Sequence, residues 1–171
     1  MDESRRGFFK SFSIPFSEKE EQVWQPIRLP YNKDKTLFET VCVTCEDKPC
    51  IPVCDENIIK VLDDGSVFLD FSKRGCTYCD ACAEACNKEV LILDEEIDRI
   101  EAHIKLDMTK CMAWNGVICS SCRDVCYDRA IKFLGMLRPE IVYDNCTNCG
   151  FCIGVCPSYA ISALSTTKEA S

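Results

Sequence analysis

The sequence has no long apolar run and none of the motifs that enzymes use to bind nucleotides. No stretch of the 171 residues is apolar for the length needed to cross a membrane, and none resembles the core of a signal peptide. There is also no Gly-rich phosphate loop, no flavin or nicotinamide fingerprint, and no nucleophile beside a plausible base. We therefore expect no transmembrane segment and no bond-making enzyme.

Basic residues are fewer than acidic ones, 20 against 28, and the formal net charge is −8 at pH 7. A chain this acidic repels nucleic acid and anionic lipid. We therefore expect neither as a partner. A redox donor protein with a basic surface would suit the chain better.

Cysteine, in contrast, is abundant, with 16 in the chain. Such a density is typical either of a disulfide scaffold or of a metal protein. Because no export signal is complete, we expect the thiols to lie in the reducing cytoplasm, where disulfides do not persist. The sequence thus favours a cytoplasmic metal protein.

The cysteines fall into four groups of four that recur along the chain, which indicates an internal repeat. The groups are one (Cys42, Cys45, Cys50, Cys54), two (Cys76, Cys79, Cys82, Cys86), three (Cys111, Cys119, Cys122, Cys126) and four (Cys146, Cys149, Cys152, Cys156). Short β-like segments at 66–71, 102–106 and 140–143 precede three of them, and apolar stretches at 90–93, 130–134 and 160–164 follow. Each unit is expected to be a strand, a cysteine loop, a short helix and a strand.

Groups two and four have the spacing C-x2-C-x2-C-x3-C of bacterial ferredoxins, and Pro157 follows group four. Three thiolates two residues apart can converge on three irons of a 4Fe–4S cluster, while the x3 step carries the fourth cysteine toward a second cluster. All sixteen cysteines are therefore predicted iron ligands. Zinc also uses C-x2-C pairs, but zinc ribbons place two pairs far apart. The predicted fold class is α+β, with repeated bacterial-ferredoxin-like units packed around the clusters.

Groups one and three depart from this spacing. Group one has four residues, including Pro49, before its third cysteine, and group three has seven residues between Cys111 and Cys119. Trp114 and Gly116 lie in that gap, and a loop there could return the chain to the same cluster. The sequence predicts four clusters, or three if group three is degenerate. It leaves their pairing open, as one with two and three with four, or one with four and two with three.

The cysteine-rich region is expected to span 37–164, as two two-cluster halves at 37–95 and 100–164, with a flexible tail at 165–171. An N-terminal arm at 1–36 lacks cysteine and is broken by prolines, so we expect it to be extended or weakly structured. Residues 4–10 match the twin-arginine export consensus, but the apolar stretch that export needs is missing. The arginines are either a solvated basic end or part of a docking segment. The candidate partner-binding residues are Arg5, Arg6, Phe8 and Phe9.

The third group, read together with Ser-Arg-Arg-Gly-Phe near the N-terminus, resembles the ferredoxin-type protein NapF of periplasmic nitrate reductase systems. The similarity extends from residue 4 to about residue 161. It implies a cytoplasmic accessory protein that binds the precursor of the nitrate reductase catalytic subunit before export and assists its maturation or redox loading. The spacing of group one departs from the NapF pattern and looks more like ferredoxin subunits of membrane oxidoreductases, including NapG-like proteins. An electron-transfer subunit serving a membrane-linked or molybdenum oxidoreductase is therefore the alternative, and a scaffold that donates its clusters is a third.

Overall fold

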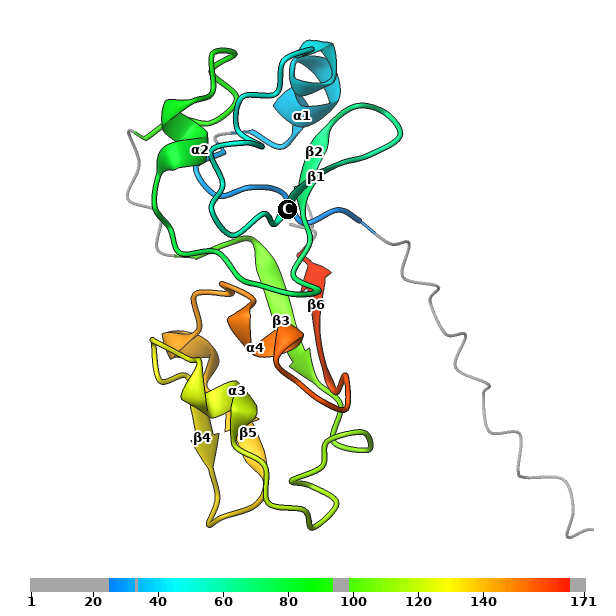
Figure 1. Ribbon diagram of the computed structural model, residues 1–171, viewed down its shortest axis with the longest axis vertical. Helices are drawn as coiled ribbons and strands as arrows, with labels where there is room; N and C mark the ends of the chain where they lie inside the picture. Colours follow the sequence, from blue (N-terminus) through cyan, green and yellow to red (C-terminus); the bar gives the residue numbers. More distant parts are fainter. Residues whose placement is uncertain (1–24, 33, 94–98, 167–171) are drawn as a thin grey trace, which may run out of the picture.

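The computed structural model describes residues 25–32, 34–93 and 99–166. Its helices and strands are short and mixed, as the α+β prediction requires. Figure 1 shows them gathered in two groups along the long axis of the molecule. We call residues 25–93 the N-terminal half and residues 99–166 the C-terminal half. Within the described ranges, no helix is long and apolar enough to cross a membrane.

The N-terminal half is built around a small hairpin. Its elements are α1 (Thr36–Thr40), the 3-10 turn η1 (Cys42–Thr44), β1 (Ile59–Val61), β2 (Val67–Leu69) and α2 (Ala81–Glu84). Strands β1 and β2 pair antiparallel, with Ile59 opposite Leu69. The turn between them uses Gly65 at φ 87°, a conformation that glycine adopts without strain. An isolated bridge between Asn32 and Leu91 joins the two ends of the half.

The C-terminal half repeats this plan with longer outer strands. Its elements are β3 (Ala102–Leu106), α3 (Ser121–Asp124), β4 (Ile131–Phe133), β5 (Pro139–Ile141), the 3-10 turn η2 (Tyr143–Asn145), α4 (Phe151–Gly154) and β6 (Ile161–Ser165). Strand β3 pairs antiparallel with β6, and β4 with β5. In both halves, then, the first segment pairs with the last around a central hairpin. Cysteine groups one and two lie in the N-terminal half, and groups three and four lie in the C-terminal half.

A recurring backbone turn follows each cysteine group. The residue three positions after each fourth cysteine has a positive φ, and these residues are Asn57 (54°), Glu89 (55°), Arg129 (52°) and Tyr159 (51°). None is glycine and only Asn57 is of a type that favours this conformation, so the other three left-handed turns are held by their surroundings. The turn redirects the chain from the cysteine into the strand or extended segment that follows.

The main hydrophobic core lies in the N-terminal half and includes a segment that the sequence assigned to the arm. Ile27, Leu29 and Tyr31 are buried in it together with Phe38. Alternate residues of an extended chain face the same side, which explains why these three enter the core together. The packed region therefore begins before residue 37. Residues 1–24 of the arm, with the twin-arginine-like motif and Arg5, Arg6, Phe8 and Phe9, and residues 167–171 of the tail lie outside the described residues.

Candidate iron–sulfur sites

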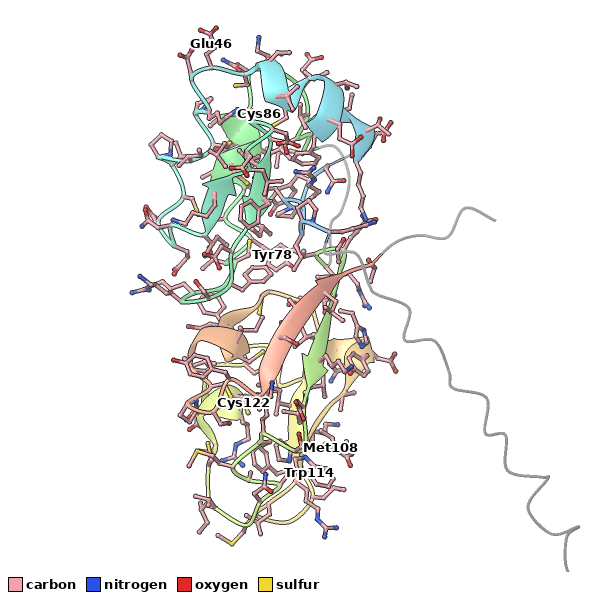
Figure 2. The ribbon with its side chains drawn as sticks, turned by 90° about the vertical axis from the view of Figure 1, so that its right-hand side faces the viewer. Glu46, Tyr78, Cys86, Met108, Trp114 and Cys122 are labelled. Carbon is pink, nitrogen blue, oxygen red and sulfur yellow. The ribbon has the colours of Figure 1, made fainter. Side chains whose placement is uncertain are left out.

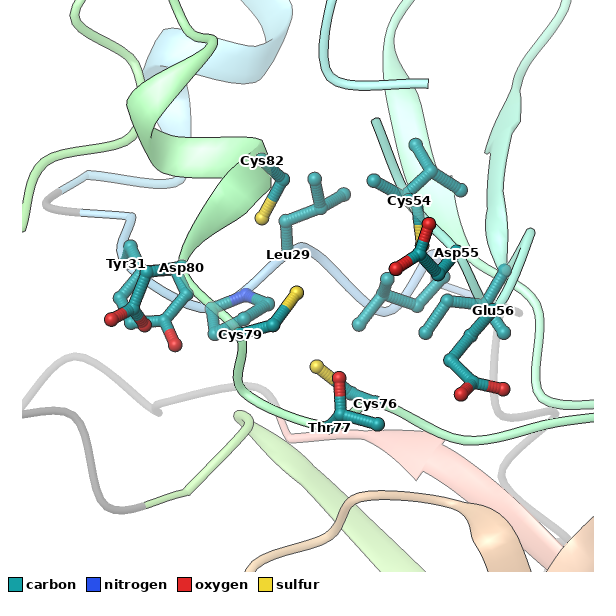
Figure 3. Close-up of a pocket in the computed structure, with 14 residues that line it drawn as sticks. Leu29, Tyr31, Cys54, Asp55, Glu56, Cys76, Thr77, Cys79, Asp80 and Cys82 are labelled. Carbon is teal, nitrogen blue, oxygen red and sulfur yellow. The ribbon is translucent and has the colours of Figure 1, made fainter. Parts of the chain in front are cut away.

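Three cysteines of group two and the last cysteine of group one line a single cavity. Its lining includes Cys76, Cys79, Cys82 and Cys54, and its volume is about 410 Å³ with its open mouth. Figure 3 shows the sulfurs of Cys76, Cys79 and Cys82 turned toward a common space, with Cys54 across from them. We call this the group-two cavity. Its fourth cysteine comes from the neighbouring group, as the ferredoxin spacing predicts.

The same exchange of cysteines recurs in two further cavities. The group-one cavity, of about 370 Å³, is lined by Cys42, Cys45, Cys50 and, from group two, Cys86. The group-four cavity, of about 360 Å³, is lined by Cys146, Cys149, Cys152 and, from group three, Cys126. In groups one and two, the x3 step therefore spans two neighbouring cavities.

The cysteines of group three also come together, despite the long gap. Cys111 is buried, and Cys119 and Cys156 pack against it in one hydrophobic cluster. The pKa of Cys122 is raised to about 11, mainly by burial and in part by the nearby thiols of Cys111 and Cys119. We call the space between these four the group-three site.

A turn closes the irregular gap of group three. Gly116 reverses the chain at φ 84°. The Asn115 side-chain amide donates hydrogen bonds to the Cys111 carbonyl (2.7 Å) and the Thr109 carbonyl (3.1 Å). Trp114 donates from its indole nitrogen to the carbonyl of Pro139 (3.0 Å), which ties the loop to β5. The seven-residue gap thus forms a folded loop that leaves Cys111 beside its partners.

Backbone amides point at several cysteine sulfurs. The N–H of Tyr78 donates to the Cys76 sulfur at 3.4 Å. The N–H groups of Ala130 and Ala160 donate to the sulfurs of Cys126 and Cys156, each at 3.3 Å. Such hydrogen bonds favour the thiolate and tune the reduction potential of a bound cluster.

Burial keeps several of the thiols protonated until a metal replaces the proton. It raises the pKa of Cys50 and of Cys76 to about 11, and that of Cys82 to about 12. Cys156 differs, because hydrogen bonds from Ala160 and Ser158 outweigh the effect of its burial and lower its pKa. Metal binding must therefore displace the protons of these buried thiols.

The charged residues around the cavities differ in sign. Lys48 and Lys88 line the group-one cavity, and the Lys48 ammonium group donates to the carbonyl of Cys45 at 2.8 Å. Asp55, Glu56 and Asp80 line the group-two cavity instead. Sequence reasoning missed these residues, although Lys48 lies in the lengthened gap of group one.

The cysteine positions fit a cluster better than a single ion. All sixteen cysteines are described, yet in the described part of the chain no three or more His, Cys, Asp or Glu side chains are close enough to bind one metal ion. Tetrahedral zinc would need four ligands at about 2.0–2.3 Å from one centre. A multi-iron cluster instead separates its ligands across a larger body.

Comparisons with known proteins agree with this chemistry. A model described as a 4Fe-4S binding domain matches residues 139–162, which run from β5 through the group-four loop into β6. The chain is 30% identical to "Ferredoxin-type protein NapF" of Escherichia coli (strain K12) over 167 residues, 95% of each chain. It is 30% identical to the protein of that name from Haemophilus influenzae over 162 residues, 92% of this chain and 89% of the other. Identity to "Ferredoxin-type protein NapG" of E. coli is 26% over 171 residues, 83% of this chain and 72% of the relative. This iron–sulfur chain therefore belongs to the NapF family of ferredoxin-type proteins.

Proposed function

We propose that the chain holds four 4Fe–4S clusters in two pairs, so that each half is a two-cluster ferredoxin-like unit. The observation that carries this proposal is the exchange of fourth cysteines between neighbouring groups. The proposed ligand sets are Cys42, Cys45, Cys50 and Cys86; Cys76, Cys79, Cys82 and Cys54; Cys111, Cys119, Cys122 and Cys156; and Cys146, Cys149, Cys152 and Cys126. When bound, such clusters supply one-electron redox chemistry, and the protein provides thiolates, amide donors and apolar cover.

The exchange of ligands gives a direct test of this assignment. Anaerobic iron and sulfide analysis of the holoprotein should give about sixteen irons per chain, and about twelve would remove one cluster from the proposal. Replacing Cys126→Ser should disturb the EPR signal of the group-four cluster. Replacing its neighbour in the same group, Cys122→Ser, should disturb the group-three cluster instead. Identical spectra for the two variants would contradict the crossed assignment.

We propose further that this iron–sulfur protein acts in the cytoplasm on the precursor of the periplasmic nitrate reductase catalytic subunit, assisting its maturation or redox loading before export. Membership of the NapF family supports this role, as does the excess of acidic side chains, which suits protein redox partners better than nucleic acid. The proposed docking segment is the arm with Arg5, Arg6, Phe8 and Phe9.

Binding of the holoprotein to the precursor and to the mature catalytic subunit tests this role. We expect transient binding to the precursor alone, and weaker binding after deletion of residues 1–16. Unchanged affinity after the deletion would contradict the docking role of the arm. Stoichiometric co-purification with the mature enzyme would favour the second candidate, a standing electron-transfer subunit. A direct backbone contact between the group-two and group-four loops is the observation that keeps this candidate open.

A further inference from the structure

The two halves meet through the backbones of two cysteine loops. The N–H of Cys76, in group two, donates a hydrogen bond of 2.7 Å to the carbonyl oxygen of Cys149, in group four. Both residues line cysteine cavities, one in each half. We call the contact between residues 71–78 and residues 147–154 the inter-half contact.

Glycines on both sides make this approach possible. A Cβ on Gly75 would lie 2.5 Å from the Cys149 carbonyl oxygen, and one on Gly154 would lie 2.5 Å from the carbonyl carbon of Lys73. Gly150 lies against the ring of Phe71 and also has φ 84°. Each half therefore contributes glycines where the two backbones approach, so the contact is a built feature of the fold.

Tyr78 fastens the same contact from the side, and Figure 2 shows it where the two halves meet. Its hydroxyl donates to the carbonyl of Thr147 and accepts from the N–H of Ile100 at 2.9 Å. The side chain of Asn148 donates to the carbonyl of Ile100, also at 2.9 Å. The group-two loop, the group-four loop and the segment before β3 are thereby joined in one network.

The contact connects two proposed cluster sites by a short route through covalent bonds and one hydrogen bond. From the sulfur of Cys76 to that of Cys149, the route runs along two cysteine side chains and their adjoining backbone and crosses one hydrogen bond. Within each half, neighbouring cavities are linked by the x3 step of a cysteine group, as from Cys82 to Cys86. The group-one cavity and the group-three site lie at the two ends of this series.

We propose that the inter-half contact is an electron crossing, which joins the sites in the order one, two, four, three. This inference rests on the proposed cluster assignment. In the crossing, one electron leaves a reduced cluster in the group-two cavity and reduces an oxidised cluster in the group-four cavity, and no bond forms or breaks. The electron comes from an external low-potential one-electron donor. Tyr78 and the glycines are positioning residues that hold the two sites together.

The test is stepwise reduction of the anaerobic holoprotein with dithionite, followed by EPR. We expect the fully reduced spectrum to require magnetic coupling between the halves, in addition to the coupling within each pair. Gly75→Ala should abolish the inter-half coupling, and Tyr78→Phe should weaken it. Gly135→Ala, at a positive-φ glycine with nothing near its Cβ position, and Tyr159→Phe, at an exposed tyrosine, are the matched controls and should leave the coupling unchanged.

Iron content separates a failure of this inference from a failure of the cluster assignment. A wild-type protein with too few irons would contradict the assignment of four clusters. With about sixteen irons bound, a wild-type spectrum equal to the sum of two independent pairs would overturn the crossing. So would full inter-half coupling in an iron-replete Gly75→Ala variant. If the Gly75→Ala variant loses iron, the Tyr78→Phe variant is the test instead. Unchanged inter-half coupling in Tyr78→Phe would contradict the role of Tyr78 and its hydrogen-bond network.

Discussion

The two halves share one plan but are stabilised differently. The main hydrophobic core, with Phe38 and Phe71, lies in the N-terminal half and extends to β3. The hydrophobic cluster of the C-terminal half consists, among the described residues, of Cys111, Ala113 and Ala160 with partly buried neighbours. The C-terminal half thus has the smaller apolar cluster, although Ile104, Ile131 and Ile161 are buried there as well.

The surfaces of the halves differ as well. Residues 25–93 contain twelve acidic and eight basic side chains, whereas residues 99–166 contain six acidic and seven basic ones. Large apolar side chains are also strongly exposed on the C-terminal half, including Ile118 at 74% and Met136 at 73%. The same plan thus presents an acidic surface in one half and a nearly neutral, more apolar surface in the other. Five experiments can sharpen or break this comparison.

The largest effect is expected on removal of iron. In iron-depleted protein, residues 99–166 should lose most of their amide protection, whereas β1, β2 and the surroundings of Phe38 should keep part of theirs, because apolar packing remains there. Hydrogen exchange with mass spectrometry, compared with the holoprotein, measures this difference. Equal loss of protection in both halves would break the comparison.

Truncation of an aromatic side chain should cost more in the N-terminal half. Phe38 is fully buried beneath Arg28, so Phe38→Ala should lower the free energy of unfolding by about 3–5 kcal/mol. Phe133→Ala removes a half-buried ring that packs against Arg123, and should cost about 1–2 kcal/mol. Guanidinium-induced loss of the visible cluster absorption, followed anaerobically, measures both. The comparison fails if Phe133→Ala is the more damaging change.

Thiol reactivity in the iron-depleted protein should follow the same division. Burial raises the pKa of Cys50 to about 11 and of Cys82 to about 12, while an unfolded thiol titrates near about 8.5. If residues 99–166 unfold on loss of iron, their cysteines titrate as unfolded thiols. At pH 8 Cys50 and Cys82 should therefore be alkylated more slowly than those cysteines, since the thiolate is the reactive form. Peptide mass spectrometry after iodoacetamide treatment gives the order.

The raised thiol pKa values also set a pH dependence for the iron-depleted fold. Because the folded state holds these protons more tightly, the stabilisation is complete below about pH 8.5 and is lost as the pH rises toward the folded values. The unfolding midpoint of the iron-depleted protein should therefore be lower at pH 10 than at pH 8. A constant midpoint, or alkylation of Cys82 as fast as that of the C-terminal cysteines, would argue against a retained N-terminal fold.

The smallest effect concerns the charge at the group-one cavity. Lys48 lines this cavity, so Lys48→Met removes a positive charge that favours the reduced cluster, and one reduction potential should fall on the order of tens of millivolts. The matched control is Lys132→Met, at an exposed position on β4. Redox titration followed by EPR measures both variants. An equal shift in the control would assign the effect to net charge alone.

The sequence predicted the parts of the structure that have local signals. The strand expected at 102–106 is β3 with the same bounds, because apolar and polar residues alternate there. The three-residue strand β1 (Ile59–Val61) was missed because it is too short to show such a period. Residues 27–31 were assigned to the arm because prolines surround them, whereas their burial depends on contacts with distant residues.

The arrangement of the groups could not be read from the sequence for a similar reason. Chain order and the alternative pairing were both open, and the choice rests on the pairing of β3 with β6, which are more than fifty residues apart. Closure of the group-three loop likewise depends on the contact of Trp114 with Pro139. The cysteine spacing identifies the chemistry, but long-range pairing decides which cysteines meet.

The glycines of the inter-half contact have a mechanical consequence. A joint made of side chains can yield by changing rotamers, but two backbones that touch through glycines have little freedom to slide or rotate. The halves should therefore move as one rigid rod, and not as two bodies joined by a hinge. A protein that engages both ends of this rod meets them at a constant spacing and angle, so the joint at Gly75 and Gly154 sets the geometry of surfaces far from it.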